Sequence, residues 1–108
     1  MNVWYRVSDL DAARDFYVST LGFKELFRDD DGWIQLGRDG VEFSIAEGEP
    51  SGEDEAVVTF DVEDVRAEAE RLRAAGVEVG VVVEIPGTIR LLDVYDPDGN
   101  RLQLTQDL

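Results

Sequence analysis

The side chains able to do chemistry in this 108-residue sequence are mainly carboxylates, because histidine and cysteine are both absent. Without histidine the chain lacks the commonest general base and the commonest transition-metal ligand. Without cysteine it lacks a thiol nucleophile, a thiolate metal site and any disulfide. Acid–base chemistry would have to use carboxylates, the three tyrosines or Lys24. We therefore expect no bound cofactor and no metal ion.

Acidic residues outnumber basic residues by 25 to 10, which gives a net charge of −15. A nucleic-acid partner is not expected, because a phosphate backbone needs a lysine and arginine stripe and is repelled by carboxylates. A cationic small molecule would instead be concentrated by the negative field. Surface solvation alone, or adaptation to a salty or hot habitat, also accounts for a charge of this size.

A second set of residues is able to bind a ligand without reacting with it. In each expected strand one face packs on a helix and the other face lines a second surface. The residues expected on these second faces mix tryptophan, arginine, glutamine and carboxylates, a composition that suits an organic ligand better than a packed core. They are Asn2, Trp4, Arg6, Glu42, Ser44, Val57, Thr59, Asp61, Arg101, Gln103 and Thr105, with Trp33, Gln35, Arg90 and Leu92 as further candidates.

Other roles remain open for several of these residues. Trp4 and Trp33 are equally suited to a core or a dimer interface, because tryptophan favours both settings. Arg6, Arg90 and Arg101 are equally suited to be solvated strand residues, since arginine is usually exposed.

Hydrophobic periodicity and turn signals indicate the helices and strands that carry these residues. Ser8 or Asp9 is expected to cap a first helix over residues 10–21, and Glu63 or Asp64 a second helix over residues 65–75. Gly22 and Gly76 are suited to end these helices. The expected strands cover residues 2–7, 23–28, 33–37 and 41–46 in the first half, and 57–62, 77–84, 88–95 and 100–106 in the second.

The order of elements repeats along the chain. Val7-Ser8-Asp9-Leu10 corresponds to Val62-Glu63-Asp64-Val65 at an offset of 55 residues, and Asp39-Gly40 corresponds to Asp98-Gly99 at an offset of 59. Such matches in the same order indicate an internal duplication. We predict a single α+β domain over residues 1–108, in which two βαβββ modules, 1–46 and 56–108, are joined by a polar linker, 47–55. The eight strands would form a curved sheet shaped as a cup, with the helices on its convex face.

These residues also resemble a known family. The segment from Val7-Ser8-Asp9-Leu10 through Asp15-Phe16-Tyr17 to Leu21-Gly22-Phe23 is similar to the opening module of the glyoxalase/bleomycin resistance/dioxygenase superfamily, which has the vicinal oxygen chelate fold. The turn Asp96-Pro97-Asp98-Gly99-Asn100 is similar to the closing signature of that family, so that the resemblance covers essentially the whole chain.

The resemblance implies where a metal would bind in metal-dependent members, which use His, Glu or Gln at four strand positions. In this sequence these positions fall on Asn2, Ser44, Val57 and Gln103. Two neutral amides, a hydroxyl and a valine make a poor set, because divalent ions in such sites favour carboxylate or imidazole ligands. A metal site is therefore not expected, although a shifted register would bring Glu42 or Asp61 to one of these positions.

The metal-free, bleomycin-resistance-type proteins are the subgroup that the chain resembles most. Phe16, the acidic turn 29–31, Arg38-Asp39, Phe43-Ser44-Ile45 and Arg90 fit that subgroup. Its drug-stacking tryptophan falls at about Thr88 here, whereas Trp33 lies next to another aromatic drug contact and Trp4 faces the same surface. The resemblance implies a homodimer that sequesters a planar cationic antibiotic or metabolite in a groove between subunits, without catalysis.

Two alternatives to sequestration remain. One is a lyase, isomerase or dioxygenase in which Glu42 or Asp61 acts as general base and Arg6 or Arg101 stabilises an enolate. The other is a scaffold that has kept the fold and lost its ligand. No signal sequence or membrane span is expected, so that a cytoplasmic location is the default.

Overall fold

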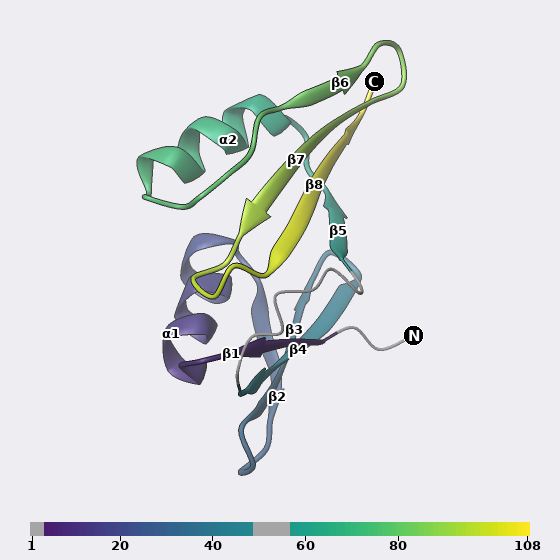
Figure 1. The fold of residues 1–108 in the computed structure, drawn as a ribbon. Coiled ribbons are helices and arrows are strands. Elements are labelled where there is room, and N and C mark those ends of the chain that lie inside the picture. The colour runs from purple at the N-terminus through teal and green to yellow at the C-terminus, as the bar shows by residue number, and fades with distance from the viewer. Residues whose placement is uncertain (1–3, 49–56) are drawn as a thin grey trace. The chain divides into compact units, whose positions relative to one another are not determined.

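The eight strands divide into two four-stranded sheets, and each sheet belongs to one half of the chain (Figure 1). The computed structural model describes residues 4–48 and 57–108. One unit comprises Met1–Ala56 with Pro97–Asn100, and the other comprises Val57–Asp96 with Arg101–Leu108. Both units have the order βαβββ, which confirms the α+β class and the duplication. Asn2 and most of the expected linker lie outside the described residues.

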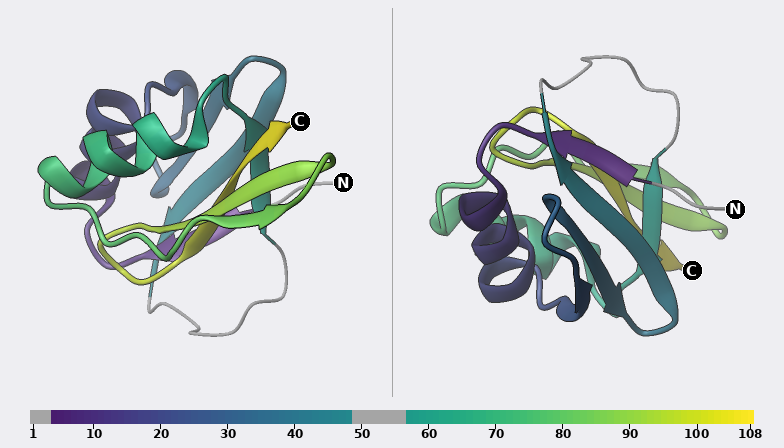
Figure 2. Two further views of the ribbon diagram at one scale, coloured as in Figure 1. Left: turned by 90° about the horizontal axis from the view of Figure 1, so that it is seen from above. Right: turned by 90° about the horizontal axis from the view of Figure 1, so that it is seen from below.

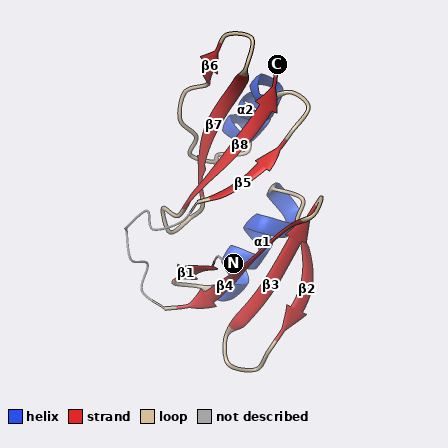
Figure 3. Cartoon of the chain, turned by 90° about the vertical axis from the view of Figure 1, so that its right-hand side faces the viewer, coloured by secondary structure: helices blue, strands red, loops and turns tan. Residues whose placement is uncertain are grey.

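The first unit has its sheet in the order β1-β4-β3-β2 (Figure 3). Strand β1 runs parallel to β4, while β3 is antiparallel to both β4 and β2. The elements of this unit are β1 (Trp4–Val7), α1 (Leu10–Asp15), η1 (Phe16–Thr20), β2 (Lys24–Arg28), β3 (Trp33–Arg38) and β4 (Val41–Glu47). Strand β4 thus includes Glu47, which the sequence places in the linker.

The first helical segment is shorter and less regular than the continuous helix expected over residues 10–21. Asp9 caps α1, since its carboxylate accepts a hydrogen bond from the Ala12 amide at 3.1 Å. From Phe16 the backbone widens into a single π-helical turn, in which the Leu21 amide donates to the Phe16 carbonyl at 3.2 Å. Local periodicity does not distinguish such a turn from an α-helix, because both present Tyr17 and Leu21 to the core.

The core of the first unit lies between this helical segment and one face of its sheet. Phe43 of β4 is at its centre, with ring centroids 5.0 Å from Tyr17, 5.1 Å from Phe23 and 5.7 Å from Tyr5. All three pairs meet edge to face, a geometry that contributes about 0.5–1.5 kcal/mol per pair beyond buried area. Burial of alternate residues on this face leaves the intervening residues on the other face.

The second unit repeats this layout with the sheet order β5-β8-β7-β6. Its elements are β5 (Val58–Asp61), α2 (Val65–Ala74), β6 (Val83–Ile85), β7 (Ile89–Tyr95) and β8 (Arg101–Asp107). Strand β6 is shorter and later than the strand expected over residues 77–84. Only Val79 of the earlier part pairs, through an isolated bridge to Val94, because the turn after Ile85 fixes the register of β6 against β7.

Helix α2 covers one face of the second sheet (Figure 2). Asp64 caps it through a 3.1 Å hydrogen bond from the Ala67 amide, which is the counterpart of Asp9 in the first unit. Val65, Ala69 and Leu72 of the helix are buried, as expected from their spacing. No helix within residues 4–48 and 57–108 has the length and apolar character required to cross a bilayer.

Candidate functional site

The sheet face of the first unit that points away from α1 carries most of the aromatic candidates. Three cross-strand rows define it: Arg6–Ala46–Trp33, Trp4–Ser44–Gln35 and Glu42–Gly37–Lys24. Phe27 of β2 extends the second row, since it pairs with Gln35. We call this surface the aromatic face. Side chains that are directly opposite or diagonal to one another on adjacent strands are close enough to interact.

Trp4 and Trp33 form the centre of the aromatic face. They come from β1 and β3, which both pair with the central strand β4. Their ring centroids are 5.7 Å apart and their planes are inclined at 44°, so that the two rings form a wedge. Trp4 remains 43% exposed, and Phe27 on the opposite edge strand of the same face is 56% exposed. Exposed aromatic rings of this size offer stacking surface to a planar molecule.

The small side chains of β4 allow this wedge to form. Ser44 lies between Trp4 and Gln35, and Ala46 lies between Arg6 and Trp33. Ser44 is 8% exposed, because the indoles cover the middle of the strand. A large residue at either position would fill the space above β4 that the two rings now share.

Arg6 completes the centre of the aromatic face. Its guanidinium carbon lies 5.2 Å from the centroid of the Trp4 ring, within the range of a cation–π interaction. The backbone of Arg6 is held by Asn100, whose side-chain amide donates to the Arg6 carbonyl at 2.9 Å. The stem of Arg6 lies over Gly48, where an added Cβ would come within 3.7 Å of the arginine Cδ.

The corresponding face of the second sheet is polar, and we call it the polar face. Its rows are Thr59–Gln103–Asp93, Asp61–Thr105–Leu91 and Arg101–Tyr95. The hydroxyl of Thr105 donates to the Asp61 carboxylate. Asp93 accepts a 3.2 Å hydrogen bond from Gln103 and lies 3.5 Å from the Arg101 guanidinium. The polar side chains of this face therefore bind one another in two groups, Thr105 with Asp61, and Asp93 with Gln103 and Arg101.

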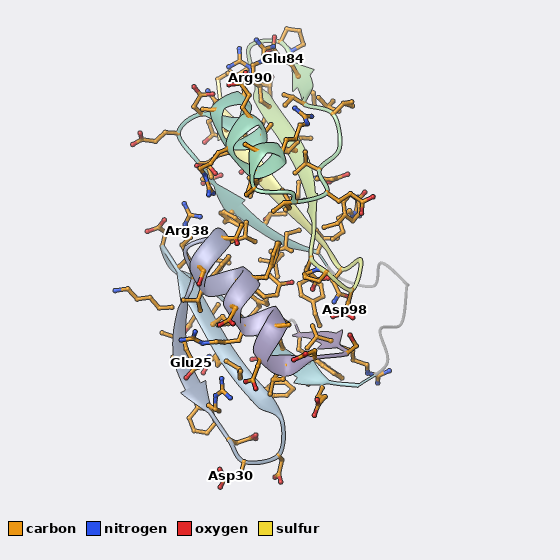
Figure 4. All side chains as sticks on the ribbon, turned by 90° about the vertical axis from the view of Figure 1, so that its left-hand side faces the viewer. Glu25, Asp30, Arg38, Glu84, Arg90 and Asp98 are labelled. Atoms are coloured by element: carbon orange, nitrogen blue, oxygen red, sulfur yellow. The ribbon has the colours of Figure 1, made fainter. Side chains whose placement is uncertain are left out.

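Arg90 and Leu92 lie on the opposite side of the second sheet, facing α2. Leu92 is fully buried opposite Leu104. Arg90 pairs with Glu84 at 2.5 Å, and this hydrogen bond holds the pKa of the Glu84 carboxyl below its ordinary value. Figure 4 labels both residues. The sequence does not indicate which residues of β7 face the helix, since the neighbouring Leu91 and Leu92 are equally apolar.

The structure thus brings together some of the expected residues and separates others. The aromatic face unites Trp4, Arg6, Trp33, Gln35, Glu42 and Ser44, while the polar face unites Thr59, Asp61, Arg101, Gln103 and Thr105. Val57 is half-buried and precedes β5. Sequence reasoning missed Phe27, Leu91, Asp93 and Tyr95. Only strand pairing assigns them to these faces, because β2 contains a bulge between Glu25 and Phe27 and β7 has no clear alternation.

An acidic pocket of about 410 Å³ lies beside the turn between β2 and β3. It is lined by Asp9, Asp11, Asp29, Asp30, Asp31 and Glu47, with Arg28 as its cation. Figure 4 labels Asp30 at the end of this turn. Asp29 shapes the turn itself, because its carboxylate accepts hydrogen bonds from the amides of Asp31 and Trp33. The pocket adds negative potential to the unit that carries the aromatic face.

The residues at the family's four metal positions do not fit a divalent ion. Ser44 lies under the indoles, Val57 has no donor atom, and Gln103 donates its amide to Asp93. Among the described residues, no group of three or more His, Cys, Asp or Glu side chains is placed to hold a metal ion. A neutral set that includes a valine lacks the charge and the number of donor atoms that such ions require.

Comparison with known proteins agrees with this architecture. The sequence model of the "Glyoxalase/Bleomycin resistance protein/Dioxygenase superfamily" matches residues 2–104. The chain belongs to this superfamily. Membership accounts for the paired βαβββ units of the chain, while the chemistry of its two sheet faces is specific to its own residues. A comparison with curated protein sequences gives no match.

Solved structures that are similar to this chain have the same fold. TnmS3, an antibiotic binding protein from Streptomyces sp. CB03234, is 30% identical, with a TM-score of 0.75, and the match covers 100% of this chain and 96% of that one. An integron cassette protein from the Halifax Harbour sewage outfall metagenome is 24% identical, with a TM-score of 0.82 and coverages of 98% and 96%. The fosfomycin resistance protein FosX from Listeria monocytogenes is 21% identical, with a TM-score of 0.82 and coverages of 100% and 92%.

Proposed function

We propose that this chain is a metal-independent protein of bleomycin-resistance type, which sequesters a planar, cationic antibiotic or metabolite in the cytoplasm. The observation that carries the proposal is the wedge of Trp4 and Trp33 on a sheet face that also exposes Phe27. Aromatic side chains that a fold leaves exposed in a cluster are typical of a ligand or partner surface.

Charge supports the cationic part of the proposal. The net charge of −15 concentrates cations near the protein, and the acidic pocket lies in the same unit as the wedge. The flat part of the ligand would stack on the indoles, while its positive end would remain near the carboxylates. Such binding is complete without a covalent step.

The relative TnmS3 also supports sequestration, since it is described as an antibiotic binding protein. The misfit of the metal positions argues in the same direction, because the metal-dependent chemistry of the superfamily needs ligands that Ser44, Val57 and Gln103 do not supply.

Titration calorimetry of the purified chain against bleomycin, at low and high salt, tests the proposal. We expect saturable binding near one drug per subunit that weakens as salt increases, because the acidic surface attracts the drug. The drug should be recovered unaltered. Absence of heat at both salt concentrations would remove the drug assignment, and an altered drug or stoichiometric metal in the protein would favour an enzyme.

A variant pair locates the binding surface. Trp33→Leu should weaken bleomycin binding about threefold to tenfold, because one stacking surface is lost. Val81→Ala is the control, since Val81 is 76% exposed and lies outside both faces. Equal affinities of the two variants would place the drug elsewhere on the chain.

We also propose that the chain forms a homodimer, as the bleomycin-resistance resemblance implies. Leu26 and Phe27 on the edge strand β2, and Val83 and Ile85 on the edge strand β6, are about half exposed. Natural proteins usually cover exposed apolar edges of this kind. Analytical ultracentrifugation should give twice the 12.1 kDa chain mass, and a monomer would exclude a groove between subunits.

A further inference from the structure

Arg6 differs from the other arginines of this acidic chain. Of the nine arginines, seven pair with at least one carboxylate: Arg14, Arg28, Arg38, Arg66, Arg71, Arg90 and Arg101. Arg73 donates to the Gly80 carbonyl. Within residues 4–48 and 57–108, Arg6 forms no ion pair, and its guanidinium contacts the Trp4 ring instead. Arg6 thus contacts an aromatic ring, whereas the other eight arginines bind oxygen atoms.

The fold positions Arg6 for this contact. Asn100 holds the Arg6 backbone at the end of β1, and the stem of the side chain lies over Gly48. In the second unit, Asp61 occupies the position that corresponds to Arg6, because Arg6 is opposite Ala46 as Asp61 is opposite Thr105. The Asp61 carboxylate is engaged by Thr105, whereas the small Ala46 provides no such partner for Arg6.

The contact with Trp4 leaves the hydrogen-bonding capacity of Arg6 available. A cation–π interaction uses the positive charge of the guanidinium and consumes none of its five N–H donors. An arginine beside an aromatic surface therefore presents charge and paired donors to any molecule that stacks there. Carboxylate and phenolate oxygens are the acceptors that match this arrangement.

We infer that Arg6 binds an acidic oxygen carried by the planar part of the ligand, so that the preferred ligands are aromatic rings bearing a carboxylate or phenolate. This inference rests on the proposed function and specifies the ligand of the same site. The positively charged group of the ligand is then separate from the stacked ring and lies towards the acidic pocket. Arg6 thus selects against rings whose stacked part is itself cationic.

Three probes with the same ring and different charges test the inference: 2-naphthoate, 2-naphthamide and 2-naphthylmethylammonium. The two tryptophan indole N–H signals, assigned with Trp4→Phe and Trp33→Phe, report binding by NMR titration. Despite the net charge of −15, the wild-type chain should bind naphthoate more tightly than the ammonium probe. Arg6→Gln should weaken naphthoate binding about tenfold, as expected for loss of a charged hydrogen-bond partner, and reverse the order of the two probes.

Arg66→Gln is the matched control, because it changes the net charge equally and Arg66 lies on α2, where its exposed side chain pairs with Glu84 at 3.6 Å. Two results would overturn the inference: tighter binding of the ammonium probe by the wild type, or an equal effect of Arg6→Gln and Arg66→Gln on naphthoate. Loss of the inference leaves the proposed function intact if bleomycin still binds in a Trp33-dependent manner. If bleomycin does not bind either, both the inference on Arg6 and the proposed function are rejected.

Discussion

Ser8 and Asp98 are joined by two hydrogen bonds although they lie 90 residues apart in the sequence. The Ser8 amide donates to one carboxylate oxygen of Asp98 at 3.1 Å, and the Ser8 hydroxyl donates to the other at 2.6 Å. Asn100 of the same turn holds the Arg6 carbonyl. The turn at residues 96–100 thus fixes the end of the strand that carries Trp4 and Arg6. The turn that resembles the family's closing signature therefore has a structural role in this chain.

Asp98→Ala should destabilise the protein by about 1 kcal/mol, because both Ser8 donors lose a charged acceptor at a solvent-accessible position. Urea denaturation followed by circular dichroism measures this change. Asp30→Ala removes the same charge from an exposed position of the β2–β3 turn and is the control. If the two variants have equal stability, the Ser8–Asp98 pair makes no net contribution.

Enlarging Ala46 should open the tryptophan wedge without unfolding the protein. In Ala46→Leu the new side chain would occupy the space above β4 between Arg6 and Trp33. We expect bleomycin binding to weaken about threefold to tenfold, as for loss of one stacking surface. The circular dichroism couplet of the two indoles should also diminish. Ala67→Leu, on the exposed side of α2, should change neither quantity.

Gly22 ends the first helical segment with a φ of +78°, in the left-handed region. Gly22→Ala should cost about 1–2 kcal/mol of stability, because an L-residue with a Cβ is strained in this region. The cost should be purely conformational, since the nearest atom to an added Cβ is Arg38 Nη1 at 3.8 Å. Gly80→Ala, where the added Cβ would make ordinary contacts with Asp93 at 3.6 Å, should be nearly neutral by thermal denaturation.

Glu25 should make the stability of the protein depend on pH. The hydrogen bond from Arg28 at 3.0 Å, assisted by Arg14 at 3.2 Å, holds the pKa of the Glu25 carboxyl below its ordinary value of 4.5. Because this pKa is lower in the folded state, ionised Glu25 contributes to the free energy of unfolding. This contribution is complete above pH 4.5 and is lost as the pH falls through the folded pKa.

Glu25→Gln should therefore be less stable than the wild type at pH 7, by less than about 1 kcal/mol because the group is solvent-screened. This difference should vanish towards pH 3 in urea titrations at a series of pH values, as both groups become neutral. Glu70→Gln, an exposed position on α2, is the control. A difference that persists unchanged in acid would show that Glu25 acts through packing.

Local sequence patterns specify the helix caps, the faces of β1 and the duplication of the elements. Asp9 and Asp64 cap helices at equivalent positions, and the alternation in β1 assigns Tyr5 and Val7 to the core and Trp4 and Arg6 to the open face. These features depend on short-range hydrogen bonding and on the period of a strand, which nearby residues specify. The absence of histidine and cysteine likewise fixes the available chemistry at the level of composition.

Long-range strand pairing sets which candidate residues lie together. The pairing of β1 and β3 with the same central strand brings Trp4 to Trp33, and no local pattern encodes that neighbourhood. The side of β7 that faces α2 depends on its register with β8, so that Leu92 is buried and Asp93 joins the polar face. Strand register is set by partners far away in the sequence, and a shift of one residue exchanges the two faces. For the same reason, the contact between the Arg6 guanidinium and the Trp4 ring became visible only in the folded chain.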